Sequence, residues 1–543
     1  MEEVTTISQR LAQASQAASR QFKLAPASKA RMEDALAGAI NPQKLIDNVA
    51  EAWRISDTDA RQLLEAHGFG GVLARLAAPT AKHDSDETTG PPLTFNAVYK
   101  LAAGAIQVRS LGPAFNEPTR APAAVLDTVR KSISTFAPTA SADPLGVLYR
   151  DRPAAYAKKW LAADAPRIDA YLRQHFGATG PKYLVNSGIG ANEQFNYFVS
   201  ALANARPDCR TTWLLANSPK EIAALPADAT ADNTLFMEFS RSGITEETVK
   251  LHELTPRTAK RIVFANSGPL AALARRDGNL LLELPSEVSG RYGRNKTPIL
   301  MAPMHVAGLD VTAYWSIIQS ACEAMNLAEP ASLPVVLAQY LRIQQLRYRI
   351  NHIYLGTNHE LLRFSADEFC QYWNEGVNRD GNDITMSRYL GLPRDSHMNL
   401  EAILGTAEHK MAIFLLATRR DTAPTGCPCP ADALSHPLLL PSADALQPEH
   451  AGLTAADVDL VLALANVKRC SEKMPTVLIT VDRVDLSASA WLGQLWADTT
   501  LVYSRLIGVD PGSNPEVKAV RTRAAQWLAD RSAAEALIRK AVT

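Results

Sequence analysis

Neither sign of charge prevails in this sequence, and no part of it is a long apolar run. Lys plus Arg and Asp plus Glu number 56 each. Such a chain has no global field to steer it to nucleic acid or to an anionic membrane, so any anion site must be local. No segment reaches the roughly 18 apolar residues of a membrane span, and MEEVTTISQRLAQ lacks a basic, then apolar, signal region. We therefore expect a cytoplasmic protein that binds neither nucleic acid nor membrane.

Cysteine is scarce, with six scattered through 543 residues. Only Cys427 and Cys429 lie close together, and His436 is the one nearby residue that could join them on a zinc ion. A structural zinc needs four ligands at a recognisable spacing, which these three do not supply. Free thiols in a reducing compartment are the better interpretation, and we expect no metal.

The chain is too long for one ordinary domain, and its 47% hydrophobic residues suffice for a large core. Residues 1–90 show helical spacing of apolar residues and end in the polar, Pro- and Gly-marked stretch TAKHDSDETTGPP. We interpret them as a helical extension that ends in a linker. The polar, Pro-rich stretch DTAPTGCPCPADALSHP, much later in the chain, is predicted to be a surface loop.

From residue 91 onward, short apolar runs alternate with helix-length patterns. The runs are KYLVNSG, TTWLLANS, TLFMEFS and RIVFANSG, followed by HIYLGTN, KMAIFLLATR and TVLITVD. Within each half this rhythm is that of strand–helix–strand units, which predicts parallel-rich sheets flanked by helices. The stretch LAEPASLP separates the halves. We predict an α/β fold with two doubly wound domains, residues 91–330 and 331–510, and a C-terminal helical segment, residues 511–543.

A polar turn follows the apolar run in NTLFMEFSRSGITEETVKL. It carries Ser240, Ser242, Gly243 and Thr245. Beyond the carboxyl end of a parallel strand, free N–H groups and the dipole of the next helix favour an anion, and hydroxyls add donors. Gly243 would let the backbone approach a ligand closely. The alternative is an ordinary helix cap, which Ser and Thr supply in many proteins.

A second polar turn lies in VNSGIGANEQF, between a predicted strand and a predicted helix. Gly188 and Gly190 are spaced for a tight turn with outward-facing amides. The third glycine and the acidic partner about 20 residues on, which mark a dinucleotide site, are both missing. Two such turns in consecutive units indicate a small anionic ligand.

These blocks resemble the phosphoglucose isomerases, a family built from two sugar-isomerase (SIS) domains. GIGAN is similar to the family's G-I-G-G-S turn, SRSGITEET to its S-K-[ST]-x-x-T-x-E-T phosphate loop, and SGRYG to its G-G-R-[YF]-S segment. The similar blocks run in order from roughly residue 95 to residue 525. The resemblance implies that Ser240, Ser242 and Thr245 hold a sugar phosphate and that Arg291 is an active-site arginine.

The resemblance also implies the chemistry, an aldose–ketose isomerisation through an enediolate. Glu375 stands where the family carries the base that moves a proton between two carbons. His397 stands in its catalytic-histidine loop and would open the sugar ring, and Arg291 would stabilise the enediolate. In this family the histidine comes from the neighbouring subunit, which implies a homodimer with composite sites. No metal or organic cofactor is required.

Without the resemblance, each of these residues has an ordinary interpretation. Glu375 would be a solvated glutamate at a helix end, and Arg291 half of a surface salt bridge. A lone histidine is usually structural, and His409 is a rival to His397, although it abuts a predicted strand.

Several residues depart from the family's pattern, and they lie in the site itself. They are Asn192 for serine, Arg241 for lysine, Glu401 for glutamine, Asn514 for glutamine, Arg521 for lysine, and Asn378, which stands one place further from Glu375 than expected. Arg521 can orient an oxygen or neutralise charge, but arginine does not readily give up a proton. The base, the histidine and Arg291 are retained.

Three functions follow from this combination. The first is a divergent glucose-6-phosphate isomerase of glycolysis and gluconeogenesis, and the second an isomerase of a related anionic sugar. The third is a non-catalytic sugar-phosphate sensor, since SIS domains also serve as binding modules. Glu375 and His397 favour an enzyme, because a sensor needs no base. We predict that the protein interconverts glucose 6-phosphate and fructose 6-phosphate.

Overall fold

The computed structural model describes residues 96–101, 104–111, 159–188, 193–206, 209–284, 292, 296–327, 331–378, 384–392, 395–418, 455–509, 511 and 515–542. By internal contacts the chain divides into Met1–Thr89 and Gly90–Thr543, and all described residues belong to the second unit. The predicted helical extension, the linker and the Pro-rich loop lie outside the described residues. No helix among those described is both long and apolar enough to cross a lipid bilayer.

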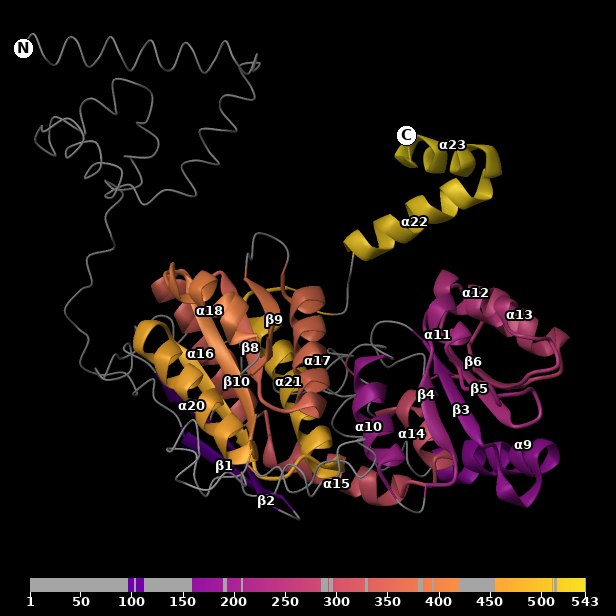
Figure 1. Ribbon diagram of the computed structural model, residues 1–543, viewed down its shortest axis with the longest axis horizontal. Coiled ribbons are helices and arrows are strands. Elements are labelled where there is room, and N and C mark those ends of the chain that lie inside the picture. The colour runs from indigo at the N-terminus through magenta and orange to yellow at the C-terminus, as the bar shows by residue number, and fades with distance from the viewer. Residues whose placement is uncertain are drawn as a thin grey trace, which may run out of the picture. The chain divides into compact units, whose positions relative to one another are not determined.

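Five parallel strands form the sheet of the first half, in the order β4-β3-β5-β6-β7 (Figure 1). They are β3 (Tyr183–Ser187), β4 (Thr212–Leu215), β5 (Thr234–Phe239), β6 (Lys260–Phe264) and β7 (Leu280–Leu282). The helices around them are η3 (Trp160–Asp164), α9 (Ala165–Phe176), η4 (Gly177–Thr179), α10 (Gln194–Asn204), α11 (Pro219–Ala223), α12 (Glu246–Leu254), α13 (Gly268–Arg276), α14 (Pro298–Val306) and α15 (Val311–Ala324).

Helices cover both faces of this sheet, which is why its strands read as continuous apolar runs. Leu235 and Met237 of β5 pack on one face in a core shared with α9, α10, α14 and α15. Phe236 lies in a separate core on the other face, with Ile222 of α11. Every residue of β5 is buried. All carboxyl ends share one edge, so the turns after β3 and β5 lie on the same side of the sheet.

Six strands form the second sheet, in the order β1-β2-β11-β10-β8-β9. They are β1 (Asn96–Leu101), β2 (Gly104–Leu111), β8 (His352–Thr357), β9 (Thr385–Gly391), β10 (Lys410–Ala417) and β11 (Thr476–Val481). The helices are α16 (Leu333–Tyr348), α17 (Glu360–Gly376), α18 (Ser396–Leu404), α20 (Ala455–Lys473), α21 (Leu486–Leu506), α22 (Pro515–Ala529) and α23 (Arg531–Val542). Strands β8 to β11 are parallel, and their two faces pack on separate cores.

The hairpin of β1 and β2 corrects one predicted domain boundary. Residues 96–111 were expected in the first domain, 91–330, but β2 pairs antiparallel with β11, and Val108 lies opposite Ile479. Ile106 and Val108 are buried in the core of the second half. The physical reason is that β11 would otherwise be an open sheet edge, which the hairpin satisfies with backbone hydrogen bonds.

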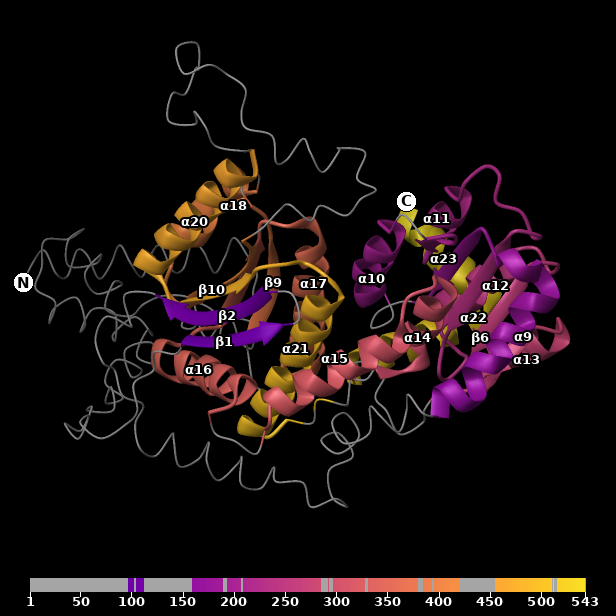
Figure 2. The same ribbon diagram turned by 90° about the horizontal axis from the view of Figure 1, so that it is seen from below.

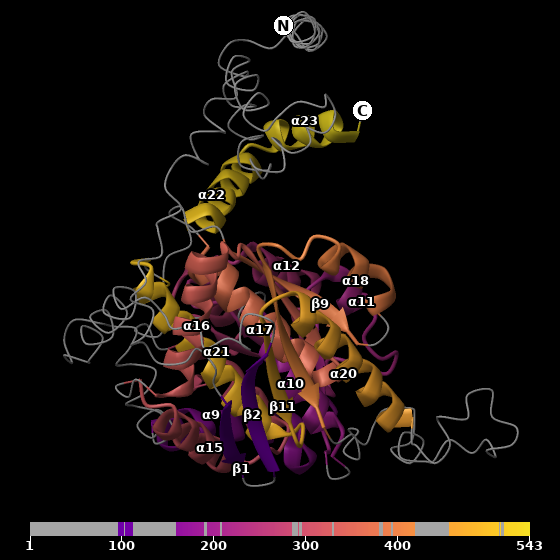
Figure 3. The same cartoon turned by 90° about the vertical axis from the view of Figure 1, so that its left-hand side faces the viewer.

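Helix α21 is central to the second half. Nearly all of its residues are buried, because α15, α16 and α17 pack around it (Figure 2; Figure 3). The two halves meet where α10 packs against α17 and the rings of Tyr197 and Phe364 stack with centroids 5.1 Å apart. Each of the seven apolar runs predicted to be strands is a strand, and the predicted α/β fold with two doubly wound, helix-flanked sheets is confirmed.

Candidate active site

The turn after β5 has the predicted strand–turn–helix form. The amide of Gly243 donates to the carbonyl of Ser240 over 2.8 Å, which closes the turn. The hydroxyls of Ser240 and Thr245 are hydrogen-bonded over 2.8 Å. Thr245 is the N-cap residue of α12, but its side chain accepts no hydrogen bond from that helix. The Thr245 hydroxyl is therefore directed to Ser240 and does not act as an ordinary helix cap.

Gly243 is required by a neighbouring turn. Its φ of +65° favours glycine, and a Cβ at this position would lie 1.8 Å from the carbonyl oxygen of Ser267. The carbonyl of Gly243 accepts a hydrogen bond from Leu270, and that of Ser242 accepts one from the Ser267 hydroxyl. The close approach that needs a glycine is thus an approach to the turn between β6 and α13. Arg241 and Ser242 are exposed on the outer side of the loop.

The turn after β3 is tied to the turn after β4. The amide of Gly188 donates to Oδ1 of Asn217 over 2.8 Å, and the amide of Asn217 donates to Glu221 over 2.7 Å. The predicted outward-facing amide of Gly188 is therefore already bonded to protein. Gly190 and Asn192 lie outside the described residues.

Carboxylates at this edge were missed in the sequence. Burial, together with the charges of Glu221 and Asp367, raises the pKa of Glu193 above its ordinary value. Burial also raises the pKa of Tyr197 to about 12, with Glu221 and Glu193 adding to the effect. Glu193 directly follows the GIGAN turn. That position in the sequence could have drawn attention to Glu193, because a carboxylate is unexpected beside a turn that is predicted to bind an anion.

Glu375 lies in the last turn of α17, which is fixed to β9. Asn374 exchanges two hydrogen bonds with the backbone of Met386, of 2.7 and 2.9 Å, and Trp373 donates to the carbonyl of Ile384. Glu375 itself is half-buried and accepts a hydrogen bond from Gln371 over 3.0 Å. The carboxylate of Glu375 is therefore partly shielded from solvent at the end of the helix.

Three distant parts of the chain meet beside Glu375. Tyr292 is fully buried, and its hydroxyl lies 3.4 Å from the carbonyl of Tyr372 and 3.5 Å from that of Pro511. A Cβ on Gly376 would lie 2.2 Å from the same hydroxyl. Tyr292 adjoins the predicted Arg291, Gly376 adjoins Glu375, and Pro511 precedes Asn514 by three residues. Arg291 and Asn514 themselves lie outside the described residues.

Helix α18 carries His397 in its first turn and Glu401 one turn later. The backbone of His397 is described but its side chain is not, and Glu401 is exposed. Lys410 holds the other end of α18 by donating to the carbonyl of Ala402 over 2.9 Å. The rival His409 has a left-handed φ of 64° and donates from Nδ1 to the carbonyl of Tyr348 over 3.2 Å, which is a structural contact.

Arg521 lies on α22, which packs against α23. Its side chain is exposed and forms no ion pair with a described residue. Asn378, just beyond α17, donates to the hydroxyl of Thr385 over 3.3 Å. The described structure therefore brings the neighbours of Glu375, Arg291 and Asn514 together, but it does not pair Arg521 with a described carboxylate.

A metal site is not formed by the described residues. They contain no group of three His, Cys, Asp or Glu side chains that could hold an ion. The described cysteines are free, namely Cys209, Cys322, Cys370 and Cys470. Cys427, Cys429 and His436 lie outside the described residues.

Comparison with solved structures identifies the fold. No known family profile matches the chain, and no curated protein matches its sequence. A hypothetical protein from Thermus thermophilus matches with a TM-score of 0.58 at 19% identity, over 75% of this chain and 95% of that one. A glucose-6-phosphate isomerase from Chlamydia trachomatis matches with a TM-score of 0.56 at 13% identity, over 80% of this chain and 84% of that one. This chain therefore shares their α/β fold.

Proposed function

We propose that this protein is an aldose–ketose isomerase of phosphorylated sugars and that it interconverts glucose 6-phosphate and fructose 6-phosphate. The observation that carries the proposal is the contact among the chain neighbours of Arg291, Glu375 and Asn514, which are 84 or more residues apart. We infer that this contact brings a base, a permanent cation and a polar amide to one site, which suits an enediolate reaction. The fold shared with a glucose-6-phosphate isomerase agrees with this chemistry.

The phosphate is held by the loop after β5. Ser242 supplies one hydroxyl donor, and the bonded pair Ser240 and Thr245 supplies a second, because one hydroxyl of the pair donates to the other. The amino end of α12 supplies the positive end of a helix dipole. Arg241 is exposed on this loop and adds a guanidinium, which can bind two phosphate oxygens at once. Asn192 and Asn514 are proposed to complete the binding of the sugar phosphate.

Ring opening comes first, because hexose phosphates are mostly closed rings. His397 gives a proton to the ring oxygen while the C1–O5 bond breaks, and the imidazole then takes up the proton that the O1 hydroxyl loses as the aldehyde forms. Imidazole suits this exchange near neutral pH. Arg521 and Glu401 are proposed to orient sugar oxygens, since a guanidinium does not readily release a proton.

Glu375 then carries out the isomerisation. Its carboxylate takes the proton from C2, and the electron pair moves to form the enediolate, whose negative charge Arg291 stabilises. The proton of the O2 hydroxyl passes to O1, so that O2 becomes the ketone oxygen, while Glu375 returns a proton to C1. Exchange of the proton on Glu375 with solvent between the two steps brings deuterium into the sugar. No electrons leave the substrate, so carboxylate, imidazole and guanidinium suffice.

An isomerase of another anionic sugar is the second candidate. The exposed guanidinium of Arg241 and the carboxyl of Glu193, whose pKa is raised, change the recognition surface at this edge. A panel of aldose and ketose phosphates, assayed for interconversion, separates the two candidates.

Proton exchange at C2 of glucose 6-phosphate in deuterated water, followed by NMR, tests the proposal. We expect deuterium incorporation and fructose 6-phosphate formation with wild type, and a loss of about 10²- to 10⁴-fold in kcat for Glu375→Gln. Glu360→Gln is the matched control, because Glu360 is exposed in the first turn of the same helix. Binding of glucose 6-phosphate without exchange in wild type would instead favour a sensor or another substrate.

A further inference from the structure

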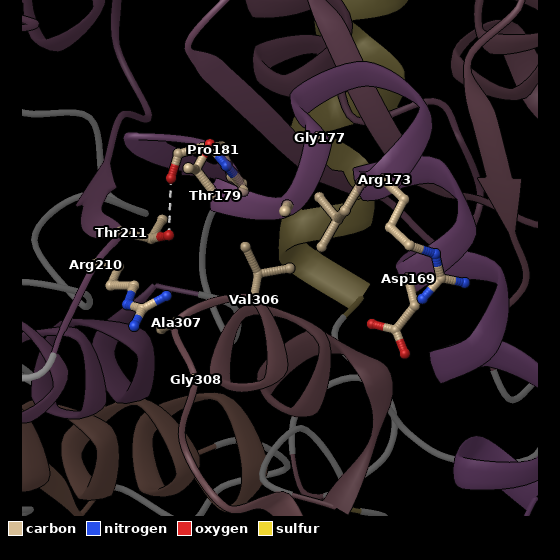
Figure 4. A pocket seen from close by; sticks show the side chains of 13 residues that line it. Asp169, Arg173, Gly177, Thr179, Pro181, Arg210, Thr211, Val306, Ala307 and Gly308 are labelled. Carbon is tan, nitrogen blue, oxygen red and sulfur yellow. Dashed lines mark hydrogen bonds between the residues drawn. The ribbon is translucent and has the colours of Figure 1, made fainter.

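A separate pocket, shown in Figure 4, is lined by residues from the end of α9, from the end of α14 and from the segments before β3 and β4. It lies at the edge of the first sheet opposite the candidate active site. Because β3 and β4 are parallel, these segments mark their amino ends, whereas Gly188 follows the carboxyl end of β3. The pocket has a volume of about 480 Å³, enough for a small metabolite.

Two guanidinium groups line this pocket from different elements. Arg173 comes from α9 and Arg210 from the segment before β4, and Figure 4 shows them on opposite sides of Val306. Neither guanidinium makes a hydrogen bond or ion pair with any residue that the structure describes. The carboxylate in the pocket, Asp169, is engaged by Nε2 of His305 over 2.8 Å. The two arginines therefore leave the pocket with an excess of positive charge.

The helix ends at the pocket do not offer a cation site. Carbonyls at the end of a helix favour cations, but three of those at the pocket already accept hydrogen bonds from the protein. The carbonyl of Arg173 accepts from the amide of Gly177, and that of Phe176 accepts from the Thr179 hydroxyl. At the end of α14, the carbonyl of His305 accepts from the amide of Gly308 over 3.0 Å. Charge and hydrogen bonding thus both favour an anion.

We propose that this pocket binds a small organic anion with an acidic group at each end. A guanidinium fork matches a phosphate or carboxylate with two parallel hydrogen bonds. Arg173 and Arg210 each hold one acidic group, and the apolar side chains of Leu172 and Val306 pack against the carbon chain between them. Sugar bisphosphates and di- or tricarboxylates share this chemistry. The site does not depend on the proposed isomerase activity.

Isothermal titration calorimetry on the full chain tests the site, with fructose 1,6-bisphosphate, citrate and inorganic phosphate as probes. We expect one of the doubly acidic probes to bind wild type more tightly than inorganic phosphate does. Arg173→Ala and Arg210→Ala should each weaken that binding about tenfold, and the double variant should abolish the binding at this pocket and leave only any binding at the candidate active site. Both side chains are exposed, so the melting temperature should stay unchanged.

Two controls assign the binding to this pocket. Arg275→Ala removes an exposed arginine of α13 outside the pocket and should leave the affinity unchanged. Ser240→Ala reports on the candidate active site at the opposite edge. It should weaken any phosphate binding there and leave unchanged the binding that Arg173→Ala and Arg210→Ala weaken. The proposal is wrong if neither doubly acidic probe binds wild type at millimolar concentration, if the double variant binds as wild type does, or if only Ser240→Ala weakens binding.

Discussion

Gly376 illustrates how one residue beside the proposed base is fixed by a partner far away in the chain. There is no room for a side chain at this position, because Tyr292 occupies the space with its hydroxyl. Without that oxygen, the nearest atom to a Cβ would be Cγ2 of Thr500 at 3.1 Å, a contact that a small shift can relieve. A tyrosine at position 292 therefore requires a glycine at position 376.

Gly376→Ala should destabilise the protein by about 1–3 kcal/mol through overpacking and should lower kcat, because the last turn of α17 has to move. Tyr292→Phe in the same chain should recover most of both losses. Urea unfolding and isomerase kinetics of the two single variants and the double variant measure this coupling. Gly391→Ala is the control, since its Cβ would make only an ordinary contact of 3.7 Å with Asp395. Additive losses in the double variant would contradict the pairing.

At the scale of elements, a buried charge network fixes the frame of the proposed phosphate loop. Glu238 of β5 accepts from Nε of Arg261 in β6 over 3.2 Å and lies 2.6 Å from Nδ1 of His252 in α12. The other ring nitrogen of His252 lies 3.3 Å from Asp277, just after α13. The hydrogen bond from Arg276 holds the pKa of Asp277 well below its usual range. Four elements around the loop are thus joined by charged hydrogen bonds.

Arg261→Met should cost about 3–5 kcal/mol of unfolding free energy, because it leaves the buried carboxylate of Glu238 without its guanidinium partner. Arg276→Met is the matched control. It removes an exposed guanidinium that pairs with Asp277 over 2.7 Å, so solvent screening should keep its cost far below that of Arg261→Met. If urea unfolding gave the same loss of unfolding free energy for Arg261→Met and Arg276→Met, burial would not determine how much these charged hydrogen bonds stabilise the protein.

The strands of both sheets could be predicted because burial on both faces makes them apolar runs of recognisable length. The side-chain hydrogen bonds and ion pairs of polar residues within these strands could not be predicted. Glu238 stands in such a run, and nothing in the sequence shows that His252 and Arg261 neutralise it. Likewise, the turn with Gly243 was located correctly, but the reason for the glycine is a contact with a turn 25 residues away. The sequence shows the periodicity of apolar residues and the spacing of motifs along the chain. The contacts of Glu238 and Gly243 depend instead on how separate helices, strands and turns pack together.

At the scale of the whole molecule, the two halves share the proposed site. Glu375 and His397 both belong to the second half, whereas Ser240 and Arg291 belong to the first. The contact of Tyr292 with Tyr372 and Pro511 joins the halves beside Glu375, and the stacking of Tyr197 on Phe364 joins them toward the amino end of the same helix, α17. We propose that a second copy of the chain completes the site with its own His397, as the family resemblance implies.

Mixing two inactive variants tests this composite site. If His397 acts across the interface of a homodimer, a heterodimer of Glu375→Gln and His397→Ala contains one intact site and one doubly altered site. After complete subunit exchange, about a quarter of wild-type activity should return, since half of the dimers are mixed. A mixture that stays inactive, with exchange verified by mass spectrometry, would show that each chain supplies both residues to its own site.

The hairpin of β1 and β2 also constrains how the protein is made. Residues 96–111 leave the ribosome early, but their partner β11 is among the last strands to be synthesised. The second sheet therefore cannot be completed until most of the chain has been synthesised. Until then, the side chains of Ile106 and Val108 are not buried by their native neighbours. Such a long wait for a distant strand slows folding and exposes an apolar hairpin to other chains. A growing chain of this protein is thus most vulnerable to aggregation before residues 476–481 emerge.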